Sequence, residues 1–334
     1  MNVVENSGYS RMLGLVRDST QPGTQADALH GSLEAVVLAD WNCPACGDTA
    51  ICNRREVPDH EYGLNFKAVY VVCANCKTVC QYPMPNSDQL SSFYPSDYHS
   101  MRGGGLLKQV RHSLRLRRLE AIAKGRGAWL DYGCGDGSFL VQAARRIPEN
   151  EYYGFEISPR RKVFRLAGDA VTVVQGALGD LLEVLPPCRL ITMNHVIEHL
   201  PDPAEVVSTL TMRLVPGGVF EGQTPNSDSL EHTIFKGNWS GYHAPRHTVV
   251  FSRRGMHSLL LSAGLTEIHV SGAFNPAGLA VSFASIFHDG AGGRIPRQGP
   301  KWLASLGMAT VFAPLDLVLG PPGIINFSGW KKGN

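Results

Sequence analysis

The sequence predicts an α/β protein in which a doubly wound, mostly parallel sheet follows a small cysteine-rich domain. Two observations support this. Short apolar strand segments alternate with helical segments from residue 127 to residue 226, and two Cys-x-x-Cys pairs precede them. With 334 residues, 43% of them hydrophobic and 18% charged, the chain is long enough for one large domain and a smaller one. The formal net charge of +2 lacks the basic excess that phosphate binding usually brings, so a nucleic-acid partner is not expected.

The cysteine-rich domain is expected at 41–82, after a loosely ordered tail at 1–40. Cys43-Pro-Ala-Cys46 and Cys73-Ala-Asn-Cys76 are separated by residues 47–72. Each pair can form a tight turn that points two thiolates at one ion, and two such turns complete a tetrahedral structural zinc site. A redox pair is the alternative, but two copies flanking the strand-like AVYVVC fit a zinc ribbon better.

Residues 83–125 are expected to form a linker followed by a helix with a basic face. Prolines and aromatic residues fill the first part, and apolar residues recur at helical spacing from 106 to 123. The other face of this helix carries Lys108, Arg111, Arg115 and Arg118. Such a face either binds phosphate or is simply solvated, and the second interpretation is favoured.

The larger domain reads as alternating strands and helices joined by short connections. Strands are expected at 127–133, 151–158, 170–176, 188–200 (running into a turn) and 219–226, and helices at 138–147, 159–168 and 202–218, the last ending at a glycine pair. This alternation favours a parallel sheet covered on both faces, in which ligands bind at the C-terminal edges of the strands.

A glycine-rich turn, DYGCGDG at 131–137, follows the first of these strands. Glycine tolerates positive φ and has no Cβ to collide with a ligand, and the helix that follows directs its free N–H groups at that ligand. Glu156 ends the second strand, where a carboxylate can accept both hydroxyls of a ribose. Asp131 is unsuited to a pyrophosphate but suits an ammonium group. S-adenosylmethionine combines a ribose with an amino-acid ammonium.

Five motifs, LDYGCGDGSFL, YGFEIS, NHVIEHLPDP, LVPGG and TPN, together resemble the class I S-adenosylmethionine-dependent methyltransferases. The resemblance implies a seven-stranded, Rossmann-like methyltransferase domain at 126–275, followed by a C-terminal extension at 276–334. It implies cofactor contacts at Asp131, Gly133, Gly135 and Gly137 (methionine moiety), Glu156 (ribose), Asp180 (adenine), and Asn194 and His195 (beneath the sulfonium). Cys188 and Arg189 depart from the family, because relatives commonly open this strand with an aspartate.

The segment at 226–252 is where this fold usually builds a lid over the acceptor. Its run NWSGYHAPRHTVVFS is similar to that of zinc-ribbon methyltransferases, some of which use a histidine here as the base. We expect His247 to be the general base or acceptor anchor, His243 to be the second candidate, and Arg246 to bind an anionic group of the acceptor. The alternative is that these residues only hold the lid in place.

The run His195-x-x-Glu198-His199 is similar to the Glu-x-x-Glu-His run of some ubiquinone-type O-methyltransferases. That resemblance implies a divalent metal near Glu198 and His199, although histidine replaces the first glutamate. The alternative, which the sequence favours, is that Glu198 and His199 form hydrogen bonds to backbone groups of the turn.

The N-terminal region also resembles bacterial methyltransferases that carry a zinc ribbon ahead of the catalytic domain and modify sugars, polysaccharide precursors or secondary metabolites. The resemblance implies an enzyme with a small-molecule acceptor of the saccharide type. A cytoplasmic protein is expected because no segment combines a basic start, an apolar centre and a cleavage site. The apolar stretch at 302–327 leaves open a homodimer contact or a peripheral membrane contact. The alternative function is an RNA methyltransferase whose ribbon binds RNA.

Overall fold

The computed structural model describes residues 36–37, 40–95, 105–157, 171–287 and 294–333. The predicted tail falls almost wholly outside these ranges, as does the helix expected at 159–168. The main feature is a seven-stranded sheet in the order β11-β12-β9-β8-β5-β6-β7. Its strands are β5 Ala128–Tyr132, β6 Glu151–Glu156, β7 Val171–Gln175, β8 Cys188–Asn194, β9 Leu214–Pro225, β11 Leu265–Ala273 and β12 Ile324–Lys331.

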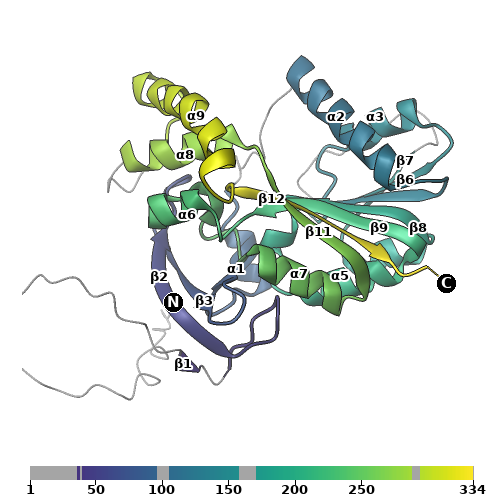
Figure 1. The fold of residues 1–334 in the computed structure, drawn as a ribbon, viewed down its shortest axis with the longest axis horizontal. Coiled ribbons are helices and arrows are strands. Elements are labelled where there is room, and N and C mark those ends of the chain that lie inside the picture. The colour runs from purple at the N-terminus through teal and green to yellow at the C-terminus, as the bar shows by residue number, and fades with distance from the viewer. Residues whose placement is uncertain (1–35, 38–39, 96–104, 158–170, 288–293, 334) are drawn as a thin grey trace, which may run out of the picture. The chain divides into compact units, whose positions relative to one another are not determined.

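Helices cover both faces of this sheet (Figure 1). On one face α2 (Leu106–Ile122) and α3 (Ser138–Arg146) bury Leu116 and Leu140 against Leu190 of β8. On the other face α4 (Leu178–Val184), α5 (Pro203–Met212) and α7 (Arg253–Ser262) bury Leu210 and Leu259 against the neighbouring residue of β8, Ile191. Successive strand residues thus point into two separate cores, which explains why these strands are apolar almost throughout. The predicted α/β fold class is confirmed.

One element boundary predicted from the sequence is wrong. The helix expected at 202–218 ends at Met212, and β9 begins already at Leu214, which pairs with Cys188 of β8. Pro216 explains the difference, because proline lacks the N–H that a helix interior needs and its ring clashes with the preceding turn.

The C-terminal extension at 276–334 is not separate from the larger domain. Its last strand, β12, lies between β9 and β11 and runs antiparallel to both, so residues 324–331 complete the sheet. Two helices, α8 (Pro276–Phe287) and α9 (Pro300–Leu319), are inserted between β11 and β12. The predicted boundary at 275 therefore cuts through the domain. A strand supplied from beyond two helices leaves no local signal of its destination.

A second, smaller sheet has the order β1-β2-β3-β4-β10. It contains β1 (Val36–Val37), β2 (Ala50–Pro58), β3 (Lys67–Cys73), β4 (Val79–Gln81) and β10 (Val249–Val250), all antiparallel. Most of it lies within the predicted ribbon at 41–82, but β10 comes from the segment expected to form the acceptor lid. The ribbon and the lid therefore share one hydrogen-bonded sheet. A short helix, α1 (Ser87–Ser92), follows, capped by Asn86.

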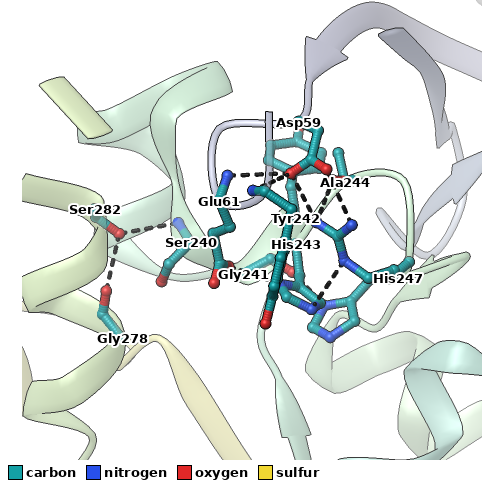
Figure 2. Close-up of polar contacts among 12 residues, drawn as sticks. Asp59, Glu61, Ser240, Gly241, Tyr242, His243, Ala244, His247, Gly278 and Ser282 are labelled. Carbon is teal, nitrogen blue, oxygen red and sulfur yellow. Dashed lines mark hydrogen bonds and ion pairs between the residues drawn. The ribbon is translucent and has the colours of Figure 1, made fainter. Parts of the chain in front are cut away.

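The rest of the lid contains three short helices, α6 (Leu230–Phe235), η2 (Lys236–Asn238) and η3 (Ser240–Tyr242). Ser282 of α8 accepts the N–H of Ser240 through Oγ at 2.9 Å and donates to the carbonyl of Gly278, which fastens the lid to the inserted helices (Figure 2). Within the described residues, no helix is long and apolar enough to cross a membrane.

Candidate active site

The glycine turn after β5 has the backbone shape that the sequence predicts. Gly133, Gly135 and Gly137 have φ values of +80°, +60° and +73°, the left-handed region that glycine adopts at no steric cost. A Cβ at Gly133 would also lie 2.2 Å from Cγ2 of Val196. Gly137 is the N-cap of α3, so the N-terminus of that helix opens onto the turn. The turn can therefore receive a ligand against bare backbone.

Two carboxylates flank this turn. Glu156, at the end of β6, accepts the N–H of Gly135 through Oε2 at 3.0 Å and is only 6% exposed. Asp131, near the end of β5, is equally buried and accepts a hydrogen bond from Thr192 of β8 at 2.5 Å. Asn194 ends β8, beside β5. Four of the predicted cofactor positions, Asp131, Gly135, Glu156 and Asn194, thus meet at one edge of the sheet.

Behind Asp131 lies a charged network that the sequence did not reveal. Glu221, in the middle of β9, is fully buried and accepts hydrogen bonds from Arg118 and, at 3.5 Å, from Arg115. Arg115 also reaches Asp131 at 3.2 Å. Two arginines of the basic helix α2 therefore neutralise two buried carboxylates, so neither of the two predicted uses of its basic face applies to them. The one available signal was Glu221 itself, the single charged residue of β9.

Two further predicted cofactor positions, Asp180 and His195, have local partners. Asp180 accepts the N–H of Ala177 at 2.9 Å and caps α4 just after β7, the strand beyond β6. His195 follows β8 with φ of +54°, and its Nε2 lies 3.0 Å from Oε1 of Gln223.

Arg246 is the centre of the lid. It is fully buried, and its guanidinium forms a two-pronged ion pair with Asp59 of the ribbon at 2.7 and 3.0 Å. Its other N–H groups donate to the carbonyls of Phe93 and Ala244 and to Nε2 of His243. Every guanidinium N–H thus has a protein partner. The geometry makes Arg246 an anchor between ribbon and lid, in place of the predicted ligand for an anionic acceptor group.

The two lid histidines differ in what their ring nitrogens contact. Nδ1 of His243 lies 2.6 Å from Oε1 of Glu61, and Nε2 lies 3.1 Å from Nε of Arg246. An arginine N–H can only donate, so Nε2 of His243 must be unprotonated and Nδ1 carries the hydrogen. In His247, Nδ1 lies 2.8 Å from the carbonyl of Gly241, which leaves Nε2 as the acceptor nitrogen. Figure 2 shows Asp59, Glu61, His243 and His247 converging at this point.

His247 is surrounded by further titratable side chains. Nε2 of His247 is 3.9 Å from Oε1 of Glu198, and its ring meets that of His199 edge-on at 4.5 Å between centroids. Burial lowers the pKa of His199 to about 4, and burial and the neighbouring His199 place the pKa of His247 well below its usual value. Both imidazoles are therefore neutral near pH 7.

The aromatic residues of the lid are packed inside it. Trp239 is buried and donates its indole N–H to Glu231 at 3.2 Å, while Tyr242 is buried and contacts His232 at 2.9 Å. These rings shape the lid and present no open face for stacking on an acceptor.

The four cysteines of the two Cys-x-x-Cys pairs lie together at one end of the ribbon. Their Sγ atoms all lie within 4.8 Å of one another, with Cys43–Cys76 and Cys46–Cys73 each at 3.6 Å. Gly47 and Lys77, directly after the two pairs, both adopt positive φ, so the turns have matching shapes. A zinc ion bound at about 2.3 Å to each sulfur holds the sulfurs slightly less than 4 Å apart, so the cluster fits zinc.

The strand order, the glycine turn and the carboxylate after the second strand can be compared with those of known proteins. Residues 106–270 match the family model described as "Methyltransferase domain". This part of the chain is therefore similar to known methyltransferase domains.

Individual relatives are similar over part of the chain. A probable S-adenosylmethionine-dependent methyltransferase of Mycolicibacterium smegmatis is 31% identical over 173 residues, 51% of this chain and 63% of the relative. A trans-aconitate 2-methyltransferase of an Azoarcus species is 32% identical over 117 residues, 33% of this chain and 46% of the relative. The chain thus spans less than two thirds of these curated relatives. A crystal structure of a SAM-dependent methyltransferase from Archaeoglobus fulgidus aligns with a TM-score of 0.45 and 18% identity, covering 67% of this chain and 94% of that one.

Proposed function

We propose that this protein is an S-adenosylmethionine-dependent methyltransferase that acts on a small polar molecule. The observation that carries the proposal is the position of the Glu156 carboxylate, 3.0 Å from the Gly135 amide at the open edge of the sheet. A ribose can bind there through both hydroxyls while its amino-acid end lies along the glycine turn towards Asp131. Asn194 and His195 would then lie beneath the sulfonium, and Asp180 is assigned to the adenine side.

The bound cofactor supplies an electrophilic methyl group, and the task of the chain is to hold the acceptor in line with it and exclude water. We place the acceptor between His195 and the lid. Of the two lid histidines, we assign His247 as the base that removes the proton of the acceptor, because Nε2 of His243 already accepts the N–H of Arg246. Nε2 of His247 faces Glu198, a carboxylate that can stabilise positive charge on the ring.

The acceptor class is a proposal that rests on relatives. The zinc-ribbon methyltransferases that the N-terminal region resembles often modify saccharides, whereas the trans-aconitate 2-methyltransferases are named for a small carboxylic acid. We propose a saccharide-type acceptor. Incubating the protein with labelled S-adenosylmethionine and a metabolite extract, followed by mass spectrometry of products that gain one CH₂, identifies it. Labelling confined to RNA would instead establish the alternative of an RNA methyltransferase.

Two further assignments complete the proposal. Cys43, Cys46, Cys73 and Cys76 hold a structural zinc ion, supported by the spacing of their sulfurs. The exposed apolar side of α9, with Leu303, Val311 and Val318 each more than 60% exposed, supports a homodimer contact.

The test of the cofactor site is a pair of variants measured by calorimetry with S-adenosylmethionine. Glu156→Ala should abolish detectable binding, because two hydrogen bonds to a charged acceptor, at roughly 1.5–3 kcal/mol each, are lost. His247→Ala should retain binding but slow turnover. Glu151→Ala, at the exposed opposite end of β6, is the matched control and should bind normally. Equal loss of affinity in Glu156→Ala and His247→Ala would refute this division of roles.

A further inference from the structure

Three side chains from two separate segments converge beneath the lid. Glu198 and His199 lie in the single turn η1 (Ile197–His199) that follows β8, and His247 comes from the lid. One ligand atom from each lies within 4.8 Å of the other two. Glu198 is fully buried and His247 is 8% exposed, so this is an internal cluster and not a chance grouping of surface charges.

Both imidazoles are oriented by backbone carbonyls. Nδ1 of His247 lies 2.8 Å from the carbonyl of Gly241, and Nδ1 of His199 lies 3.0 Å from the carbonyl of Arg246. A carbonyl can only accept, so Nδ1 carries the hydrogen in each ring and Nε2 keeps its lone pair. Metal-binding histidines are commonly fixed in this way, with the outer nitrogen bonded to a carbonyl or carboxylate.

Glu198 supplies the independent sign that something is missing from the cluster. Its Oε2 accepts a hydrogen bond from Thr224 at 2.9 Å, but its Oε1 is buried with no hydrogen-bond partner among the described residues. The nearest nitrogens to Oε1 are Nδ1 of His195, a half-exposed side chain that can form an ion pair with it at 3.4 Å when protonated, and Nε2 of His247 at 3.9 Å. A buried carboxylate oxygen without a hydrogen bond is costly, and a cation between it and two unprotonated imidazole nitrogens would satisfy all three groups.

We propose that Glu198, His199 and His247 bind a divalent first-row metal ion on the acceptor side of the active site. Two imidazoles and one carboxylate are a ligand set suited to such ions, and three protein ligands leave coordination positions for an acceptor oxygen. The ligands lie at about 2.0–2.2 Å from such an ion, so the three side chains would have to draw together slightly on binding.

The ligand set comes from the packing of the lid on η1 and not from the local run of residues. His195 lies at the rim, with its side chain 46% exposed and its Nε2 on Gln223. It is absent from the cluster, and His247 takes its place. This inference rests on the proposed function only in placing the ion beside the acceptor. It changes the role of His247, which would then act through the ion, and a hydroxyl bound to the ion would lose its proton more readily.

The test uses the full-length protein with zinc supplied to the four-cysteine site of the ribbon. The protein is titrated with Mn²⁺, and binding is followed by electron paramagnetic resonance. Mn²⁺ prefers oxygen and nitrogen ligands, so the four-cysteine site does not compete for it. We expect one bound Mn²⁺ per chain in the wild type. Glu198→Gln and His247→Gln should each weaken binding at least about tenfold. His257→Gln, which removes an exposed histidine of α7, is the matched control and should bind as the wild type does.

Two measurements keep the proposal testable if a variant fails to fold. Spin-echo spectra of Mn²⁺ bound to the wild type should show coupling to imidazole nitrogen, and the absence of this coupling would overturn the assignment. Failure of the wild type to bind Mn²⁺, or equal binding by folded Glu198→Gln, would also overturn it. S-adenosylmethionine binding is measured separately by calorimetry. Cofactor binding without Mn²⁺ binding would refute the metal site alone. Mn²⁺ binding without cofactor binding would refute the proposed function alone.

Discussion

The ion pair between Asp59 and Arg246 allows a sharp prediction about how the ribbon supports the lid. Both side chains are 0% exposed, and Asp59 also accepts the N–H groups of Glu61 and Tyr62 at 3.1 and 2.9 Å. Asparagine in place of Asp59 keeps the shape and the Oδ1 that accepts those N–H groups but removes the charge, so the buried guanidinium loses its ion-pair partner. Removing one partner of a buried pair costs roughly 3–5 kcal/mol, a large part of the 5–15 kcal/mol that typically stabilises a domain.

Urea denaturation of Asp59→Asn should therefore show a stability loss of about 3 kcal/mol or more. The double variant Asp59→Asn/Arg246→Met should lose less, because it leaves no unpaired charge. The matched control is Asp202→Asn, at the N-cap of α5, where asparagine caps as well as aspartate and stability should stay within about 0.5 kcal/mol. A loss below about 1 kcal/mol in Asp59→Asn, or a double variant less stable than it, would refute the assignment of Arg246 as an anchor.

Three other predictions concern the ribbon, the inserted helices and their contacts. Removing the proposed zinc with a strong chelator should lower turnover while the affinity for S-adenosylmethionine, measured by calorimetry, stays unchanged; a parallel loss of both would contradict this. Burial and the charge of Asp316 raise the pKa of Glu231 to about 8, so the folded state holds that proton more tightly than the unfolded state. The protonated Glu231 contributes its full share to the free energy of unfolding below the usual carboxyl pKa of 4.5. This contribution is lost as pH rises from 4.5 towards 8, and the free energy of unfolding then falls by up to about 1.4 kcal/mol per pH unit. Glu231→Gln should flatten this dependence in thermal melts, and an unchanged slope would exclude it. Val318→Asp, on the exposed side of α9, should convert the proposed dimer to monomer in sedimentation experiments, whereas a wild type already monomeric would remove that proposal.

The sequence was most informative where a residue type has one physical use. Gly133 and Gly135 must adopt positive φ, and both do. It was least informative where position depends on distant parts of the chain. β12 joins the sheet only after α8 and α9 have been inserted, and Arg246 meets Asp59 only because β10 pairs with β4. The short pattern around Arg246 predicts a functional arginine equally well whether its partner is a ligand or a buried aspartate.

The contacts of the second cysteine turn explain why a ribbon would stand ahead of this domain. Ser252, the N-cap of α7, donates to the carbonyl of Cys76, and Ser227 donates to that of Lys77 at 3.1 Å. Both ends of the lid are therefore hydrogen-bonded to the cysteine turn that would hold the zinc ion, and β10 continues the ribbon sheet between them. The glycine turn and Glu156, by contrast, are held by β5, β6 and α3 within the other sheet. A change in the ribbon should thus affect the acceptor side through the lid before it affects the cofactor side. This is a physical reason to expect that mutation can separate the two proposed activities of the site, cofactor binding and methyl transfer to the acceptor.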